Sequence, residues 1–265
     1  MIIDMHCHII PNIDDGACDI STAIEMCRVA EQDGIYGIIA TPHYIHRVID
    51  NGRDIVCAEV IELNNHLKNR KINVDIYPGC EAFICPELPK LVSEGRICTL
   101  NNSQYVLVEL PMESIPEYTE NVIYQLKLAG YTPIIAHPER NEIINNYPDA
   151  LFNLISRGAL SQVNASSLTG LFGKDIMRVA TILLKHKMVH LVASDAHTIG
   201  GRSPRLSSAI DKIEKLAGSE TLLKIMKNSQ AILNNQWISV EEPIRIGDYG
   251  RIRFLSNFKR IFSGM

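Results

Sequence analysis

Side chains that bind metal ions through nitrogen or oxygen recur through this sequence in short, spaced motifs. His6 and His8 are separated by one residue, as are Asp195 and His197. On an extended backbone, side chains two positions apart point to the same side, so each pair can reach one cation. Nine positions are candidate ligands, and at one of them spacing does not decide between two adjacent carboxylates. The candidates are His6, His8, Asp14 or Asp15, His43, Glu81, Glu109, His137, Asp195 and His197.

The elements that must position these residues are short apolar runs that alternate with longer segments of helical period. Seven runs are predicted strands: Ile2–Met5, Ile35–Ala40, Val74–Tyr77, Tyr105–Val108, Thr132–Ala136, Leu160–Val163 and Val189–Ala193. The predicted helices are one capped by Ser21 that continues to about Asp33, then Arg53–Asn69, Glu117–Ala129 and Asp175–Lys187. The alternation predicts parallel strands joined by crossover helices, in a closed barrel or an open doubly wound sheet.

The candidate ligands follow the predicted strands, at the point where each strand ends. Because the carboxyl ends of parallel strands meet at one edge, we expect these groups to converge. Carboxylates crowded there would repel one another, and divalent cations reverse that penalty. Nitrogen and oxygen donors favour manganese, iron or zinc over a Cys-rich structural zinc site. Nine ligands exceed the needs of one tetrahedral ion, so we expect two or three ions, with Glu81 or Glu109 as a bridge.

Each candidate taken singly also has a structural explanation. A single His-x-His arises by chance, Glu109 can be an edge charge, and Asp195 can be a helix cap. Nine such coincidences at successive strand ends are improbable together. The histidines without such a placement are expected to lie outside the site, and they are His46, His66, His186 and His190.

The composition excludes several classes of function. At 265 residues, with 46% hydrophobic and 21% charged residues, the chain can bury a core without disulfides. A net charge of −4 gives no reason to expect nucleic-acid binding. Dinucleotide and P-loop glycine motifs are absent from the sequence. Seven scattered cysteines without a Cys-x-x-Cys pair, and no signal-peptide or membrane-spanning pattern, predict a cytoplasmic protein with reduced thiols.

Together the motifs resemble those of the polymerase-and-histidinol-phosphatase (PHP) superfamily, over about residues 1–235. They are similar to its bacterial capsule and exopolysaccharide protein-tyrosine phosphatase branch. The motifs are His6-x-His8 with Asp15-Gly16, Thr41-Pro42-His43, Gly79-x-Glu81, Ala136-His137-Pro138-Glu139-Arg140, Gln162-Val163-Asn164 and Ala193-Ser194-Asp195-x-His197. The resemblance implies a single α/β domain, a distorted (β/α)7 TIM-like barrel, with a trinuclear metal site usually associated with manganese.

The resemblance also implies an activity, the metal-dependent removal of phosphate from phosphotyrosine in proteins. The implied substrate is the tyrosine-rich tail of a bacterial tyrosine kinase that controls capsule or exopolysaccharide synthesis. The implied ligands are His6, His8, Asp15, His43, Glu81, Glu109, His137, Asp195 and His197, and Arg140 and Arg202 are implied to hold phosphate. The hypothesis that follows is attack on phosphorus by a hydroxide bridging the metal ions, with His197 or a water assisting the leaving group.

A cysteine-based phosphatase is not expected, because such enzymes place an arginine six residues after the reactive cysteine. None of the seven cysteines has arginine at that offset. Two other hypotheses remain. A small-molecule phosphatase of the histidinol-phosphate type would share the metals and differ in its pocket, and a metal-stabilised binding module would lack turnover. An amidohydrolase-like enzyme is disfavoured, because that class commonly uses a bridging lysine and no lysine lies at the predicted strand ends.

A change in composition near the end predicts a domain boundary. We assign residues 1–236 to the phosphatase-like domain and residues 237–265 to a basic C-terminal tail. From residue 244 onward the tail holds Arg245, Arg251, Arg253, Lys259 and Arg260 against Asp248 alone. Interleaved apolar residues favour a peripheral contact with an anionic membrane, and a solvated tail explains the same composition.

Overall fold

The computed structural model describes residues 2–238 and 240–246. The strands in these residues are β1 (Ile2–Cys7), β2 (Ile35–Ala40), β3 (His43–Tyr44), β4 (Asp75–Pro78), β5 (Glu81–Phe83), β6 (Tyr105–Glu109), β7 (Thr132–Ala136), β8 (Leu160–Asn164) and β9 (Leu191–Ala193). Two residues separate β2 from β3 and β4 from β5, so each pair is one interrupted strand. The described residues therefore hold seven strand positions, as predicted, and the strand pairs among them are parallel.

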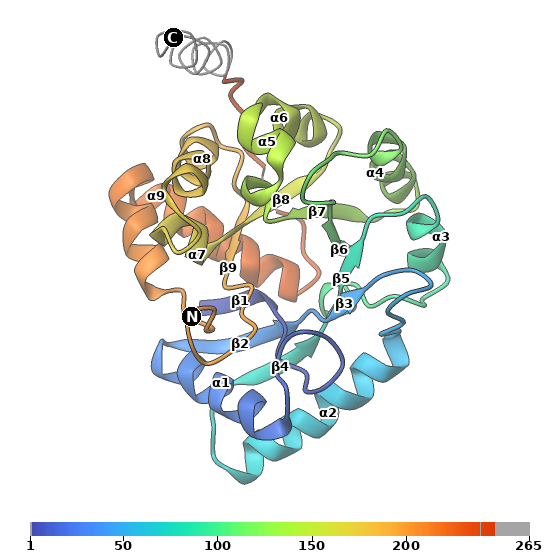
Figure 1. The fold of residues 1–265 in the computed structure, drawn as a ribbon, viewed down its shortest axis with the longest axis vertical. Helices are drawn as coiled ribbons and strands as arrows, with labels where there is room; N and C mark the ends of the chain where they lie inside the picture. Colours follow the sequence, from blue (N-terminus) through green and yellow to red (C-terminus); the bar gives the residue numbers. More distant parts are fainter. Residues whose placement is uncertain (1, 239, 247–265) are drawn as a thin grey trace, which may run out of the picture.

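These strands form two sheets, β1-β2-β4 and β3-β5-β6-β7-β8-β9. The amide of Glu81 donates to the carbonyl of Pro42 at 3.1 Å and so continues the β2–β4 pair into β3–β5. On the opposite side, the amide of Asp195 donates to the carbonyl of His6, and the amide of His8 to that of Ala196, both at 2.9 Å. These bonds join the segment after β9 to β1, and the predicted barrel-like α/β class is confirmed (Figure 1).

The helices surround the strands (Figure 1). They are α1 (Ile20–Gln32), α2 (Arg53–Asn69), α3 (Leu88–Ser93), α4 (Thr119–Leu128), α5 (Glu142–Asn146), α6 (Asp149–Ser156), α7 (Ala165–Thr169), α8 (Lys174–Lys185) and α9 (Ser207–Leu233), with 3-10 turns at Leu100–Asn102 and Pro138–Arg140. The predicted bounds of α2 are confirmed. The predicted cap of α1 is wrong, because the side chain of Asp19, not of Ser21, accepts from the amide of Thr22 at 2.7 Å. A carboxylate fits that position, where the first amides of a helix lack partners.

Apolar side chains form two layers. An inner cluster fills the space enclosed by the strands, and it includes Met5, Tyr105, Leu107, Ile134 and Leu191. An outer, larger cluster lies between the strands and the helices. This packing holds the strand ends in fixed positions, because side chains in a close-packed interior cannot shift independently.

A register shift in β1 decides which side chains reach the centre. Ile3 and Met5 belong to the inner cluster, and simple alternation would place Cys7 there too. The pairing with β2 is irregular between Asp4 and Cys7, and Cys7 belongs to the outer cluster. An extra residue in a strand reverses the faces beyond it. His6 and His8 therefore lie on the central side at the end of the strand.

Residues 240–246 run along the domain. The amide of Ile244 donates to the carbonyl of His186 at 2.9 Å, and the amide of Ile246 to Asp149 Oδ1 at 2.7 Å. Glu241 pairs with Lys187 at 3.1 Å. The predicted tail from residue 237 thus begins with a segment in contact with α6 and α8, and most of its basic residues lie outside the described residues. In the described ranges, no helix combines the length and apolarity needed to cross a membrane.

Candidate metal centre

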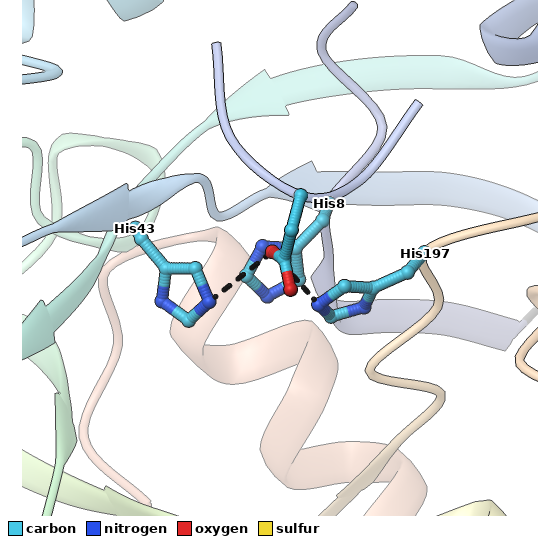
Figure 2. Close-up of side chains that lie close together, drawn as sticks. His8, His43 and His197 are labelled. Carbon is cyan, nitrogen blue, oxygen red and sulfur yellow. Dashed lines mark ion pairs between the residues drawn. The ribbon is translucent and has the colours of Figure 1, made fainter. Parts of the chain in front are cut away.

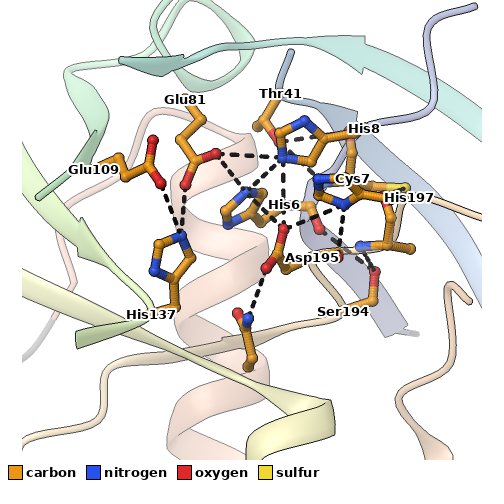
Figure 3. Close-up of polar contacts among 12 residues, drawn as sticks. His6, Cys7, His8, Thr41, Glu81, Glu109, His137, Ser194, Asp195 and His197 are labelled. Atoms are coloured by element: carbon orange, nitrogen blue, oxygen red, sulfur yellow. Dashed lines mark hydrogen bonds and ion pairs between the residues drawn. The ribbon is translucent and has the colours of Figure 1, made fainter. Parts of the chain in front are cut away.

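The candidate ligands lie at the carboxyl ends of strands or at the breaks within the two interrupted strands. His6 lies in β1 and His8 directly follows it, and Glu81 begins β5 after the break that follows β4 (Figure 3). The described residues form three overlapping groups of metal-binding side chains, with the ligand atoms of each group within 4.8 Å of one another. The groups are His8, Asp15, His43 and His197; His6, His8 and Glu81; and His43, Glu81 and Glu109. His137 and Asp195 adjoin them, so all nine predicted ligands are brought together.

Glu81 is the centre of this arrangement. Its Oε2 lies 3.3 Å from Nε2 of both His6 and His8, and its Oε1 lies 2.8 Å from Nε2 of His137. Glu81 is buried, and burial raises a carboxyl pKa, yet the surrounding imidazoles outweigh that effect and hold the pKa of Glu81 well below its usual value. Glu109 lies farther out, 3.8 Å from His137 Nε2, and burial together with the charge of Glu81 raises its pKa.

The two adjacent carboxylates after β1 have different positions. Asp14 Oδ2 lies 2.7 Å from His8 Nδ1 and accepts from the amide of His43 at 3.1 Å, and its side chain is 1% exposed. The Asp15 side chain is 66% exposed, and its Oδ1 lies 3.3 Å from His197 Nε2 and 3.5 Å from His43 Nε2. Figure 2 shows the imidazoles of His8, His43 and His197 around these ion pairs. Asp15 therefore faces the ring nitrogens that are free to bind a metal, and Asp14 supports His8 from behind.

The donors fit a set of divalent cations. Glu81 Oε2 and His43 Nδ1 are buried and lie 3.1 Å apart, yet within the described residues neither makes a hydrogen bond. Buried polar atoms are normally satisfied, and a cation between such donors supplies the missing interaction. The carboxylates of Asp15, Glu81, Glu109 and Asp195 also lie here, and bound cations would offset their negative charge.

Residues behind the ligands fix the imidazole tautomers. Nδ1 of His6 donates to Gln162 Oε1 at 2.8 Å, and Nδ1 of His8 is held by Asp14 in the same way. Each ring then presents Nε2 to the centre, as metal-binding histidines do when a second group holds the other nitrogen. Gln162 belongs to the Gln162-Val163-Asn164 motif, and the sequence alone predicted no role for it. Its position two residues before Asn164, on the same face of β8, is the signal that could have found it.

Charge sets the protonation of these rings in the absence of a cation. Burial lowers the pKa of His8, but the contacts with Asp14 and Glu81 outweigh burial and raise it to about 10. Burial and the charge of His8 lower the pKa of His197 to about 4. The two ring centroids lie 3.9 Å apart, so a proton on His8 disfavours a second proton on His197. A divalent cation takes over the role of that proton when it binds.

The two arginines meet at Asp195. Arg140 donates through Nη1 to Asp195 Oδ2 at 2.9 Å, and Arg202 donates through Nη2 to the same oxygen at 3.0 Å. Asn164 Nδ2 donates there as well, at 2.7 Å. The other oxygen, Oδ1, lies 3.5 Å from Nε2 of His6 and of His8. Asp195 therefore faces the histidines with one oxygen and holds both arginines with the other.

Comparison with known proteins identifies the family. A model of the family described as "Capsular polysaccharide synthesis, CpsB/CapC" matches residues 2–234. The tyrosine-protein phosphatase YwqE of Bacillus subtilis is 39% identical over 242 residues, which are 91% of this chain and 95% of that protein. The tyrosine-protein phosphatase CpsB of Streptococcus agalactiae is 26% identical over 243 residues, 89% of this chain and all of that protein.

A solved structure agrees with these matches. It belongs to a study of YwqE from Bacillus subtilis and CpsB from Streptococcus pneumoniae, described as unique metal-dependent tyrosine phosphatases. The TM-score is 0.90 at 38% identity, with 92% of this chain and 99% of that chain covered. The resemblance inferred from the motifs is confirmed, and this chain belongs to the CpsB/CapC family of capsular polysaccharide synthesis proteins.

Proposed function

We propose that this chain is a metal-dependent protein-tyrosine phosphatase that acts in capsule or exopolysaccharide synthesis. The observation that carries the proposal is the meeting of five histidines and four carboxylates beside two arginines, at the carboxyl ends of one ring of strands. The activity named for the relatives supports the same conclusion. The proposed substrate is phosphotyrosine in a protein, and a bacterial tyrosine kinase is the proposed partner.

The proposed ligands of two or three divalent ions, manganese first and iron or zinc as alternatives, are His6, His8, Asp15, His43, Glu81, Glu109, His137, Asp195 and His197. When bound, such ions lower the pKa of water and neutralise charge on phosphoryl oxygens. Glu81 is the proposed bridging carboxylate, because its two oxygens face different imidazoles. The overlap of the three groups supports more than one ion.

The arginines are proposed to hold the phosphoryl group. Arg140 and Arg202 are planar cations that share Asp195 Oδ2 and so lie side by side. Arginine binds phosphate through paired N–H donors, and this neutralises charge on the oxygens as the ester bond breaks. We propose that His197, which is 8% exposed, or a water molecule assists the departing phenolate. A phenol needs little help, since its reference pKa is about 10.

The test is hydrolysis by the metal-loaded protein of a phosphotyrosine peptide, the matched phosphoserine peptide and histidinol phosphate. Chelation should abolish turnover, and manganese should restore it mainly for phosphotyrosine. Glu81→Gln should lower kcat by on the order of 10³-fold with reduced metal content. The matched control is Glu94→Gln on the surface, which should change neither. Better turnover of histidinol phosphate would reassign the substrate, and unchanged kcat in Glu81→Gln would overturn the metal assignment.

We also propose that the protein lies in the cytoplasm and makes a peripheral membrane contact through the basic tail. Truncation after Ile246 tests that contact, because residues 240–246 pack against the domain and should be kept. Binding to anionic liposomes should fall in the truncated protein while phosphatase activity stays. Unchanged liposome binding would remove the membrane contact from the proposal.

A further inference from the structure

One side of the arginine pair carries an apolar loop. The loop joins α7 to α8 and contains Leu171 and Phe172 between two glycines. The guanidinium carbon of Arg140 lies 4.9 Å from the centre of the Phe172 ring. The same guanidinium donates to Asp195 at 2.9 Å. Arg140 is therefore held on its face by an aromatic ring and on its edge by a carboxylate.

Leu171 lies on the solvent side of the same loop and close to Gly201, the residue before Arg202. It is 51% exposed, and its Cδ1 lies 4.0 Å from the point that a Cβ atom at position 201 would occupy. Ile199, in the segment that carries Arg202, is 52% exposed. Exposed aliphatic side chains thus border the polar centre where the phosphate-binding groups face solvent.

The backbone explains why the two side chains point differently. Gly170 has φ 96° and Gly173 has φ 93°, a conformation that favours glycine. Two such residues turn the chain sharply within four positions. Phe172 is half-buried against Arg140, and Leu171 is left outward.

We propose that this loop forms the aryl-binding side of the substrate site, with Phe172 positioning Arg140 and Leu171 contacting the phenyl ring of phosphotyrosine. The inference rests on the proposed function. In phosphotyrosine a flat apolar ring separates the phosphate from the peptide backbone, whereas in phosphoserine a single carbon does. An apolar side chain next to the phosphate-binding arginines therefore favours the aromatic ester, because the ring leaves water when it contacts Leu171.

Inhibition by inorganic phosphate tests the role of Phe172, because phosphate engages the arginines and lacks a ring. In the metal-loaded protein, Phe172→Ala should raise the Ki of phosphate by about tenfold. Phe172→Tyr should restore it, and Phe172→Leu, which keeps apolar volume without a ring face, should not. Equal thermal unfolding and metal content among the variants separate this role from a structural one.

The KM for a phosphotyrosine peptide tests the role of Leu171. Leu171→Ala should raise the KM by about fivefold and leave the Ki of phosphate unchanged, because only the ring contact is removed. The matched control is Leu223→Ala on α9, where the leucine is 53% exposed, and it should change neither quantity. An unchanged KM in Leu171→Ala would overturn the assignment of the ring contact.

Arg140→Ala distinguishes a failure of the role proposed for Phe172 from a failure of the proposed function. If it raises the Ki of phosphate while Phe172→Ala does not, the positioning role of Phe172 is overturned and the proposed function stands. If Arg140→Ala leaves the Ki unchanged, the assignment of Arg140 to phosphate fails, and the role of Phe172 fails with it.

Discussion

His8 and His190 are both buried, at 0% and 4% exposure, and their pKa values are shifted in opposite directions. Carboxylates raise the pKa of His8 to about 10 against the effect of burial, whereas burial alone lowers that of His190 to about 4. His8 directly follows β1 at the metal centre, and His190 precedes β9 at the other end of the strands. Burial is common to both, and the neighbouring charges make one of them a candidate ligand.

The contacts of the two rings explain the opposite pKa shifts. His190 Nδ1 accepts from the amide of Ser161 at 3.1 Å, and its Nε2 has no hydrogen-bond partner among the described residues. Asp14 holds His8 Nδ1 at 2.7 Å, and the ring is directed at further carboxylates. A histidine with a neutral donor stays neutral, and one with carboxylates on both sides attracts a proton or a metal ion.

The largest effect that would sharpen this comparison comes from Asp14. Asp14→Asn removes the charge behind His8 and keeps the shape of the side chain. Metal affinity should fall by about 10–100-fold, because a group that orients a ligand is lost and the ligand remains. Titration of the metal-free protein with manganese measures it. Asp15→Asn is the companion variant, and it should lower the number of ions bound. If Asp14→Asn alone lowers that number, the two roles are exchanged.

His190 gives the next largest effect. The folded pKa is about 4 and the ordinary value 6.5, so between them the unfolded chain takes up a proton that the folded protein does not. The free energy of unfolding therefore falls as pH falls through this window, by about 2 kcal/mol from pH 7.5 to pH 5. His190→Gln should remove that part of the dependence.

Urea unfolding of the metal-free protein at the two pH values measures the difference between wild type and His190→Gln. The comparison is made by difference because the metal-centre residues titrate in both proteins. Lys185, Lys187, Lys224 and Glu241 line the same cavity as His190. Hydrogen bonds with Glu220 and Glu241 raise the pKa of Lys224, and hydrogen bonds with Lys187 and Lys224 lower the pKa of Glu241, so these two groups stay charged across the range. Equal slopes in the two proteins would contradict the neutral state assigned to His190.

The smallest effect is expected at Cys7, the last residue of β1, which lies between His6 and His8. Burial raises the pKa of this thiol well above its ordinary value, and the side chain lies in the outer apolar cluster. A thiol that stays protonated is a poor nucleophile. Cys7→Ser should therefore keep most phosphatase activity at full metal loading. Loss of all activity with the metal retained would point to a cysteine-based reaction.

The sequence was informative wherever a residue type and a strand end coincided. His6, Glu81 and Asp195 were predicted from that coincidence, and the structure brings both carboxylates within 3.5 Å of His6 Nε2. Spacing did not separate Asp14 from Asp15, because neighbours in a loop differ only in the direction of their side chains. Their exposure, 1% against 66%, requires the folded chain.

The errors in the predicted helices and strands also have physical causes. Ser21 and Asp19 are both good caps, and the choice depended on where the chain first turned. Thr41-Pro42 and Gly79-Cys80 were predicted to follow strand ends, although the two strands continue beyond them into β3 and β5. The helix Ser207–Leu233 was not predicted, and its Gly218 at φ 84° interrupts the helical period that would have revealed it.

The bonds that close the ring of strands also set an order of events during synthesis on the ribosome. The amide of Ser194 donates to Asp4 across 190 positions of sequence, and His6 meets Asp195 over a similar interval. Contacts this distant form late, because the loop between them must be closed first. A nascent chain that has exposed His6 and His8 still lacks Asp195 and His197, so metal loading has to wait until nearly the whole barrel has left the exit tunnel.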